Sequence, residues 1–273
     1  MGRVVKIGAL LLLGLVWAGC SFAADASQTR NLDSLLLALR DRDQAVRREV
    51  LRLSQQSPSP VDSLLSAYAR MQEVDAGNQR MVAGVLEEGW PEEISDEASE
   101  ALWLVIDHAD LEMQRRFMPL VEEQVKAGRL SKSSYATLLD RMLMRENRPQ
   151  RYGTQTRSFT RIVEGDSVCD QRVCYVWPVE HPASLDSLRA AMGLIPIGEY
   201  LQAVEETYGG RCIWNPELTV EQLEALLPDE LLRGSGFWRK ICRKTRGCLS
   251  ILDSVQNRAR SLYRKRKLNS FNL

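Results

Sequence analysis

The sequence predicts a mainly α protein: a helical domain with one small β-hairpin insertion and a basic amphipathic helix at its C-terminus. Over most of the chain, apolar residues recur at three-and-four spacing, which is typical of helices that bury one face. Two segments near the middle are instead rich in Thr, Val and Tyr, as strands are. With 44% apolar and 26% charged residues, the 273-residue chain is able to bury a sizeable core.

The charge composition excludes two classes of protein. The chain has 36 Lys+Arg and 36 Asp+Glu, so it is neither a uniformly basic nucleic-acid coat nor an acidic disordered chain. The charges are unevenly spread, with +2 in residues 1–23, −13 in residues 24–232 and +11 in residues 233–273. An acidic body is therefore joined to a basic tail, and we expect no specific nucleic-acid binding.

Four helices are predicted before residue 150. The first spans residues 32–53, and the second spans residues 61–88, with a bend near Gly77. The third carries an apolar stripe from Leu102 to Leu120 and ends near Gly128. The fourth begins around Ser131 and is closed by Pro149; it places these apolar residues on one face: Tyr135, Leu138, Leu139, Met142 and Leu143.

The spacing of the apolar residues changes after residue 150 from that of helices to that of strands. Thr156–Val163 and Arg172–Val179 flank a connection that contains Gly165 and Asp166, which predicts a β-hairpin. Helical spacing then returns in Ser184–Met192, Ile197–Tyr208 and Thr219–Leu227, where Thr219 and Gln222 form a capping box.

Residues 1–23 are predicted to be a secretory signal peptide. Arg3 and Lys6 precede a short apolar run, and Ser21-Phe22-Ala23 places small residues at the cleavage positions. In a second interpretation, Ala18-Gly19-Cys20 ends a lipoprotein signal and Cys20 is lipidated. Either way we expect an exported protein, periplasmic or secreted, with a mainly helical domain at 24–210 and a helical, basic extension at 211–273.

The tail at 233–273 has twelve Lys+Arg and one acidic residue, Asp253, together with an apolar stripe. Such a helix suits attachment to an anionic membrane surface or an acidic partner. It also suits a solvated tail, or one that docks on the acidic body of its own chain.

Export favours disulfides, and five cysteines follow Ala23. Of about fifteen possible connectivities we expect local pairs, Cys169 with Cys174 across the hairpin and Cys242 with Cys248. Cys212 is then left over, as a buried thiol or as a nucleophile, and the buried thiol is favoured because no His lies nearby in sequence. The cysteine spacing is not that of a zinc site, and we expect no metal ion or cofactor.

Two groups of polar residues are candidates for chemistry. On the third predicted helix, Trp103, Asp107, Asp110 and Gln114 fall on one line, where the two carboxylates could share a proton or hold a hard cation. An ordinary solvated flank would have the same pattern. His108 lies about 100° away from Asp107 and is either a base or a structural histidine.

The second group follows the fourth helix. Asp140 and Arg141 precede a turn rich in uncharged donors and acceptors, Gln150, Tyr152, Thr154 and Gln155, with Gly153 at its centre. Such a set suits the orientation of a polar ligand. A polar turn that caps the preceding helix would have the same residues.

These motifs resemble a bacterial family known only as domain of unknown function 6624. The resemblance covers roughly residues 40–205 and is carried in order by Asp43-Gln44-x-x-Arg47, Asn78, Gly89-Trp90-Pro91, His108-Ala109-Asp110 with Gln114, Asp140-Arg141, Gln150-x-Tyr152-Gly153-Thr154-Gln155, Arg189, Gly193-Leu194 and Tyr200. It implies that Trp90, His108, Asp110, Gln114, Asp140, Arg141 and the Tyr-Gly-Thr-Gln turn belong to one constellation. It implies no reaction.

Two functions fit these observations. In the first, a polar pocket binds a small polar ligand or peptide, and any catalysis uses His108 or Asp110 as base and Arg141 as charge stabiliser. The pocket would be lined by His108, Asp110, Gln114, Asp140, Arg141, Gln150, Tyr152 and Gln155. In the second, the protein is a structural or interaction domain of the cell envelope, and the same side chains form a buried network that fixes helix packing.

Overall fold

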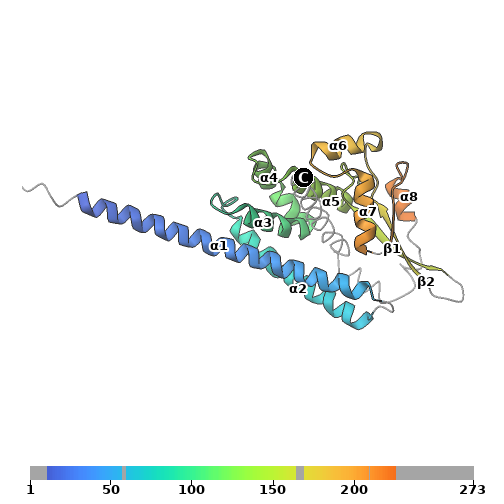
Figure 1. Ribbon diagram of the computed structural model, residues 1–273, viewed down its shortest axis with the longest axis horizontal. Coiled ribbons are helices and arrows are strands. Elements are labelled where there is room, and N and C mark those ends of the chain that lie inside the picture. Colours follow the sequence, from blue (N-terminus) through green and yellow to red (C-terminus); the bar gives the residue numbers. More distant parts are fainter. Residues whose placement is uncertain (1–10, 57–59, 164–168, 209, 226–273) are drawn as a thin grey trace, which may run out of the picture.

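The computed structural model describes the backbone of residues 11–56, 60–163, 169–208 and 210–225 (Figure 1). Within these ranges the protein is mainly helical with one small sheet, which confirms the predicted fold class. None of the described helices has both the length and the hydropathy needed to cross a membrane. The predicted basic C-terminal helix lies outside the described residues.

The first three helices build the main core. Helices α1 (Leu11–Ser54) and α2 (Val61–Val85) lie side by side, and α3 (Asp96–His108) packs against both. The N-terminal part of α1 projects beyond the rest of the fold (Figure 1). Their apolar faces meet in a core that includes Leu36, Leu39, Val82, Leu102 and Ile106. The apolar periodicity of the sequence therefore marks the helix faces that are buried. A bend was predicted near Gly77, and α2 is one continuous helix through that residue.

The predicted third helix is wrong in one respect, because it is two helices. The chain leaves the helical conformation at Ala109, and α4 (Leu111–Lys126) starts after Asp110, whose side chain accepts a hydrogen bond from the Met113 N–H at 2.9 Å. Asp110 is thus the N-cap residue of α4. With α5 (Lys132–Arg145), capped by Ser131, the described chain has five helices before residue 150 and not four.

The β element is larger than predicted. Strands β1 (Thr156–Val163) and β2 (Cys169–Val176) form the expected antiparallel hairpin, with Ser158 opposite Cys174. The second strand begins and ends three residues before the predicted Arg172–Val179. A short strand β3 (Arg211–Ile213) pairs in parallel with β2 and places Cys212 opposite Cys174. Three residues are too few to show strand alternation, so β3 carried no signal in the sequence.

Of the remaining helices, α7 covers this sheet. After the 3₁₀ turn η1 (Pro182–Ser184), α6 (Leu185–Ala191) and α7 (Ile197–Tyr208) lead into β3, and α7 packs on β2 and β3 through Tyr200, Val204 and Tyr208. Helix α8 (Val220–Ala225) buries Val220 and Leu223 against Trp177 and Met144. The predicted capping box is confirmed, because Thr219 and Gln222 exchange side-chain-to-backbone hydrogen bonds.

Candidate functional site

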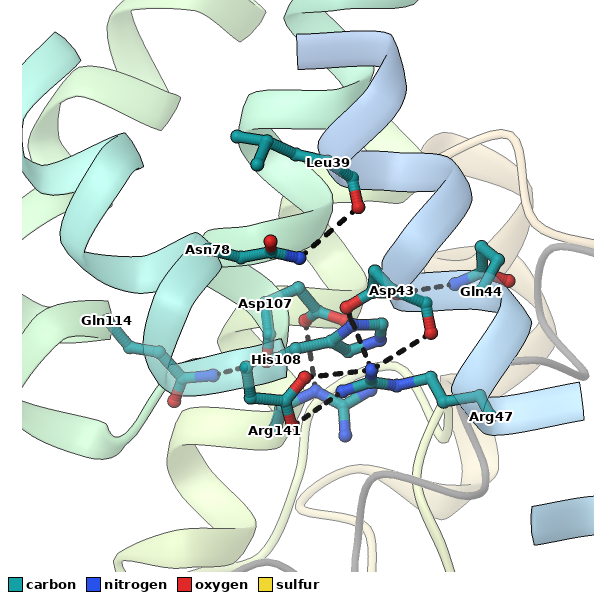
Figure 2. Close-up of polar contacts among 10 residues, drawn as sticks. Leu39, Asp43, Gln44, Arg47, Asn78, Asp107, His108, Gln114 and Arg141 are labelled. Atoms are coloured by element: carbon teal, nitrogen blue, oxygen red, sulfur yellow. Dashed lines mark hydrogen bonds and ion pairs between the residues drawn. The ribbon is translucent and has the colours of Figure 1, made fainter. Parts of the chain in front are cut away.

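Four helices bring charged side chains together inside the protein. Asp43 and Arg47 come from α1, Asp107 and His108 from α3, and Arg141 from α5 (Figure 2). Asp75 comes from α2. We call these six residues the charged cluster. Five of them are buried, and only the Asp75 side chain is partly open, with 14% of it exposed.

Arg47 is the centre of one half of this cluster. Its Nη1 donates to Asp43 Oδ1 at 2.8 Å and to Asp75 Oδ1 at 2.9 Å, and its Nη2 donates to Asp75 Oδ2 at 3.1 Å. The residues Asp43 and Arg47 are four apart, so one turn of α1 places both side chains on the same face. A buried guanidinium with two carboxylates meets the requirement that buried charge be paired.

His108 joins this half through Asp43. Its Nδ1 lies 2.8 Å from Asp43 Oδ1, the atom that also accepts from Arg47 (Figure 2). Burial raises the pKa of Asp43, but the hydrogen bond and charge attraction to His108, together with the attraction to Arg47, bring it below its ordinary value. The carboxylate is therefore held in its charged form.

Arg141 and Asp107 form the other half. Arg141 Nε donates to Asp107 Oδ1 at 3.0 Å, and neither side chain is more than 1% exposed. Gln114 Nε2 donates to the Asp107 carbonyl at 2.7 Å, which fixes the end of α3 against α4. Arg145 donates to the Ala109 carbonyl, and burial followed by repulsion from Arg141 lowers the pKa of Arg145 to about 10.

The predicted carboxylate pair of Asp107 and Asp110 does not form. Asp107 is buried against Arg141, whereas Asp110 is exposed and caps α4. The helix break at Ala109 separates the two side chains, so the single line expected from 100° steps is not kept. Among the described residues, no group of three or more His, Cys, Asp or Glu is placed to hold a metal ion.

Asp140 organises a second set of polar contacts. Its carboxylate accepts hydrogen bonds from the backbone N–H groups of Arg151, Tyr152 and Thr154 at 2.8 to 3.2 Å, and from Thr154 Oγ1 at 2.9 Å. Burial raises the pKa of Asp140 to about 6, although these four donors act in the opposite direction. Asp140 therefore anchors the predicted turn to α5.

The two glutamines close this turn. Gln150 Oε1 accepts from the Gln155 N–H at 2.8 Å, and Gln150 Nε2 donates to the carbonyls of Gln155 at 2.9 Å and Trp177 at 2.6 Å. Gln155 Nε2 reaches the Thr137 carbonyl on α5 at 3.4 Å. The turn thus bonds to itself, to the end of β2 and to α5.

Arg189 holds the turn from the other side. Its Nη1 donates to the carbonyls of Tyr152 at 2.8 Å and Gly153 at 2.9 Å, and its guanidinium lies 4.9 Å from the Tyr200 ring. Tyr200 Oη donates to the Thr154 carbonyl at 2.7 Å. We call Asp140, Gln150, Thr154, Gln155, Arg189 and Tyr200 the turn cluster.

The structure therefore divides the predicted pocket between two clusters. His108 and Arg141 lie in the charged cluster, which Gln114 borders, and Asp140, Gln150, Thr154 and Gln155 lie in the turn cluster with Tyr152 beside them. Trp90 is buried elsewhere, where its Nε1 donates to Ser99 Oγ at 3.1 Å. Helix α5 connects the clusters, because Asp140 and Arg141 are consecutive.

Several members of these clusters were not predicted as site residues. Asp43, Arg47, Asp75, Arg189 and Tyr200 make central contacts but were not among the predicted site residues. The spacing of Asp43 and Arg47 on an otherwise amphipathic helix was an available signal for an internal ion pair. Asp75 and Arg189 lie far along the chain from their partners, and local spacing contains no signal for such contacts.

The cysteines are arranged differently from the prediction. Cys174 Sγ lies 3.2 Å from Cys212 Sγ, and both are buried free thiols. The predicted bridge between Cys169 and Cys174 does not fit the hairpin, because residues five apart in one strand are about 16 Å apart and alternate between its faces. Cys242 and Cys248 lie outside the described residues, and lipidation of Cys20 stays a prediction.

Comparison with known proteins supports the resemblance seen in the motifs. A family described as a family of unknown function (DUF6624) matches residues 30–212. This range includes both clusters and ends at Cys212. Neither the curated proteins nor the solved structures contain a match to the chain.

Proposed function

The chain belongs to this family of unknown function, and from the two clusters we propose that it is a non-catalytic domain of the cell envelope. In this proposal the charged cluster and the turn cluster are an internal framework. They fix how α1, α2, α3 and α5 pack on one another and hold the turn at residues 150–155 against α5. In this proposal the protein acts through its surface on another molecule.

The proposal rests on the burial of the predicted binding residues and on their bonding within the chain. All of them except Asp110 are buried, and most bond to other parts of the same chain. Asp140, for example, receives all four of its donors from residues 151–154. A ligand site needs donors and acceptors that converge on an accessible space. Here the polar atoms of the turn cluster bond mostly to the backbone, and those of the charged cluster bond to one another.

Charge balance supports the same proposal. The carboxylates of Asp43 and Asp107, which are buried, and of Asp75, which is partly open, are balanced in number by the guanidinium groups of Arg47, Arg141 and Arg145. A paired interior of this kind fixes one arrangement of helices, because any shift leaves a charge buried without its partner. Removing one member of a buried ion pair is costly, and an interior built from such pairs suits a rigid scaffold.

We propose that export and surface attachment come from the two ends of the chain. The signal-like residues 1–23 support export to the envelope, and the basic residues 233–273 support contact with an anionic membrane surface or an acidic partner. An acidic body with a basic tail is suited to a scaffold held at such a surface.

A second function is favoured by one contact, the 2.8 Å pair of Asp43 Oδ1 and His108 Nδ1. In hydrolases, a carboxylate at Nδ1 holds the imidazole in the orientation and tautomer that let Nε2 act as a base. In this alternative, the charged cluster binds a small polar ligand or peptide, with Arg141 stabilising charge.

Two substitutions separate these functions. We expect His108→Ala and Gln155→Ala each to lower the midpoint of thermal unfolding by several degrees, because buried partners lose hydrogen bonds. His181→Ala is the matched control, since the His181 side chain is 62% exposed, and it should leave the midpoint unchanged. The same proteins are then heated with a panel of polar metabolites and short peptides.

The framework proposal predicts that no compound stabilises the wild type. It is refuted if His108→Ala melts like the wild type while a compound raises the midpoint of the wild type and not that of His108→Ala. That result would support the ligand site.

A further inference from the structure

Two cysteines from distant parts of the chain meet in the sheet. Cys174 in β2 and Cys212 in β3 are register partners in the parallel pair, and their sulfur atoms are 3.2 Å apart. Neighbouring strands lie about 4.8 Å apart, which is within the Cα separation of about 4.4 to 6.8 Å that a disulfide requires. The backbone therefore already has a spacing that suits a covalent bond.

The surroundings of the pair favour reaction at Cys174. The Cys212 thiol donates to the Cys174 sulfur, which lowers the pKa of Cys174 even though burial raises it. The same bond, with burial, raises the pKa of Cys212. Cys174 is thus the sulfur of the pair that ionises first, and thiolates are the reactive form.

We propose that Cys174 and Cys212 form an intramolecular disulfide that joins β3 to β2. The co-reactant is a disulfide oxidant, either a small-molecule disulfide or an oxidised thiol oxidoreductase. The Cys174 thiolate attacks one sulfur of the oxidant, and a mixed disulfide forms as the first thiolate leaves. Cys212 loses its proton and attacks Cys174, the mixed disulfide breaks, and the second thiolate leaves. Two protein thiols are oxidised and one disulfide is reduced to two thiols.

This bond would fasten the part of the chain that follows α7. Besides β2, strand β3 contacts α7, where Glu205 Oε1 accepts from the Cys212 N–H at 2.8 Å. Helix α8 follows eight residues after Cys212 and is held by an ion pair between Arg157 and Glu224. A disulfide at Cys212 adds a covalent attachment at the residue where the family match ends. The inference is independent of the proposed function.

The tryptic map of the full chain makes the test direct. Cleavage after Arg172 separates Cys169 from Cys174, and cleavage after Arg211 places Cys212 at the start of its own peptide. The purified chain is equilibrated in oxidised and in reduced glutathione, its free thiols are alkylated, and its peptides are analysed by mass spectrometry without reduction. We expect peptides 173–189 and 212–233 to be linked after oxidation only.

Variants and unfolding complete the test. Cys174→Ser and Cys212→Ser should each abolish this link, whereas Cys169→Ser, in the same strand, should leave it intact. Oxidation should raise the midpoint of thermal unfolding of the wild type by on the order of 5–10 °C, and that of Cys212→Ser by less. The inference is overturned if both wild-type peptides remain alkylated after oxidation, or if either cysteine is linked to a different one.

Discussion

Replacement of Asp43 by alanine tests the charged cluster at its most connected atom. Asp43 Oδ1 contacts both Arg47 Nη1 and His108 Nδ1 at 2.8 Å, and Oδ2 accepts from Gln44 Nε2 at 2.8 Å. The Asp43→Ala variant leaves a buried guanidinium with fewer partners. Removing one member of a buried ion pair costs about 3–5 kcal/mol.

The structure places the expected loss at the lower end of this range. Arg47 keeps both hydrogen bonds to Asp75, so its charge is still paired in the variant. We therefore expect Asp43→Ala to lower the free energy of unfolding by about 3 kcal/mol, or the thermal midpoint by about 6–12 °C. Asp43→Ala combined with Asp75→Ala should cost more than the two single losses added together, by about 1–3 kcal/mol, because each carboxylate compensates for the other.

Urea denaturation followed by circular dichroism measures these differences. Glu49→Ala is the matched control on the same helix, because Glu49 pairs with Arg52 at the surface and its loss should have no measurable effect. Surface ion pairs contribute up to about 1 kcal/mol to the free energy of unfolding. If Asp43→Ala lowers this free energy by less than that, Asp43 is not an internal partner of Arg47 and the reasoning is refuted.

Because burial raises the pKa of Asp140 to about 6, the folded protein binds more protons than the unfolded chain between about pH 4 and 6. The free energy of unfolding of the wild type, relative to that of Asp140→Asn, should therefore fall by up to about 3 kcal/mol as pH rises through this window. Urea titrations measure this difference, and a rise with pH would contradict a raised pKa for Asp140. Gly153→Ala should cost about 1–3 kcal/mol by the same assay, since Gly153 has φ of +64° and an added Cβ would lie 3.3 Å from Leu185 Cδ2; an unchanged midpoint would count against this strain. Asp110→Ala should cost about 1 kcal/mol, the value of a lost N-cap, and a much larger loss in urea would indicate contacts beyond Met113.

Much of the fold could be predicted because buried helix faces repeat with a regular period. The break at Ala109 was missed for a related reason. Ile106 and Met113 are seven residues apart, so the apolar stripe keeps its phase across the two residues that interrupt the helix. Only the capping role of Asp110 distinguishes two helices from one, and an aspartate also suits the polar flank of a continuous helix.

The site was predictable as a set of residue types but not as a set of contacts. Pro149 and Gly153 marked the turn, and its polar residues do act together. Their partners come from elsewhere: Arg189 is 36 residues from Gly153, and Arg141 is 34 residues from Asp107. Such pairs depend on how helices pack, and no local spacing contains that information. The same is true of Cys174 and Cys212.

The adjacency of Asp140 and Arg141 on α5 has a consequence for how the protein opens. Asp140 accepts hydrogen bonds from the turn, and Arg141 donates to Asp107 at the end of α3. Rotation or fraying of this part of α5 would therefore break contacts in both clusters at once. The amide protons of Arg151, Tyr152 and Thr154, which bond to Asp140, should then exchange with solvent in the same opening event as those in the last turn of α3. Helical bundle and sheet would behave as one cooperative unit, coupled through a single turn of helix.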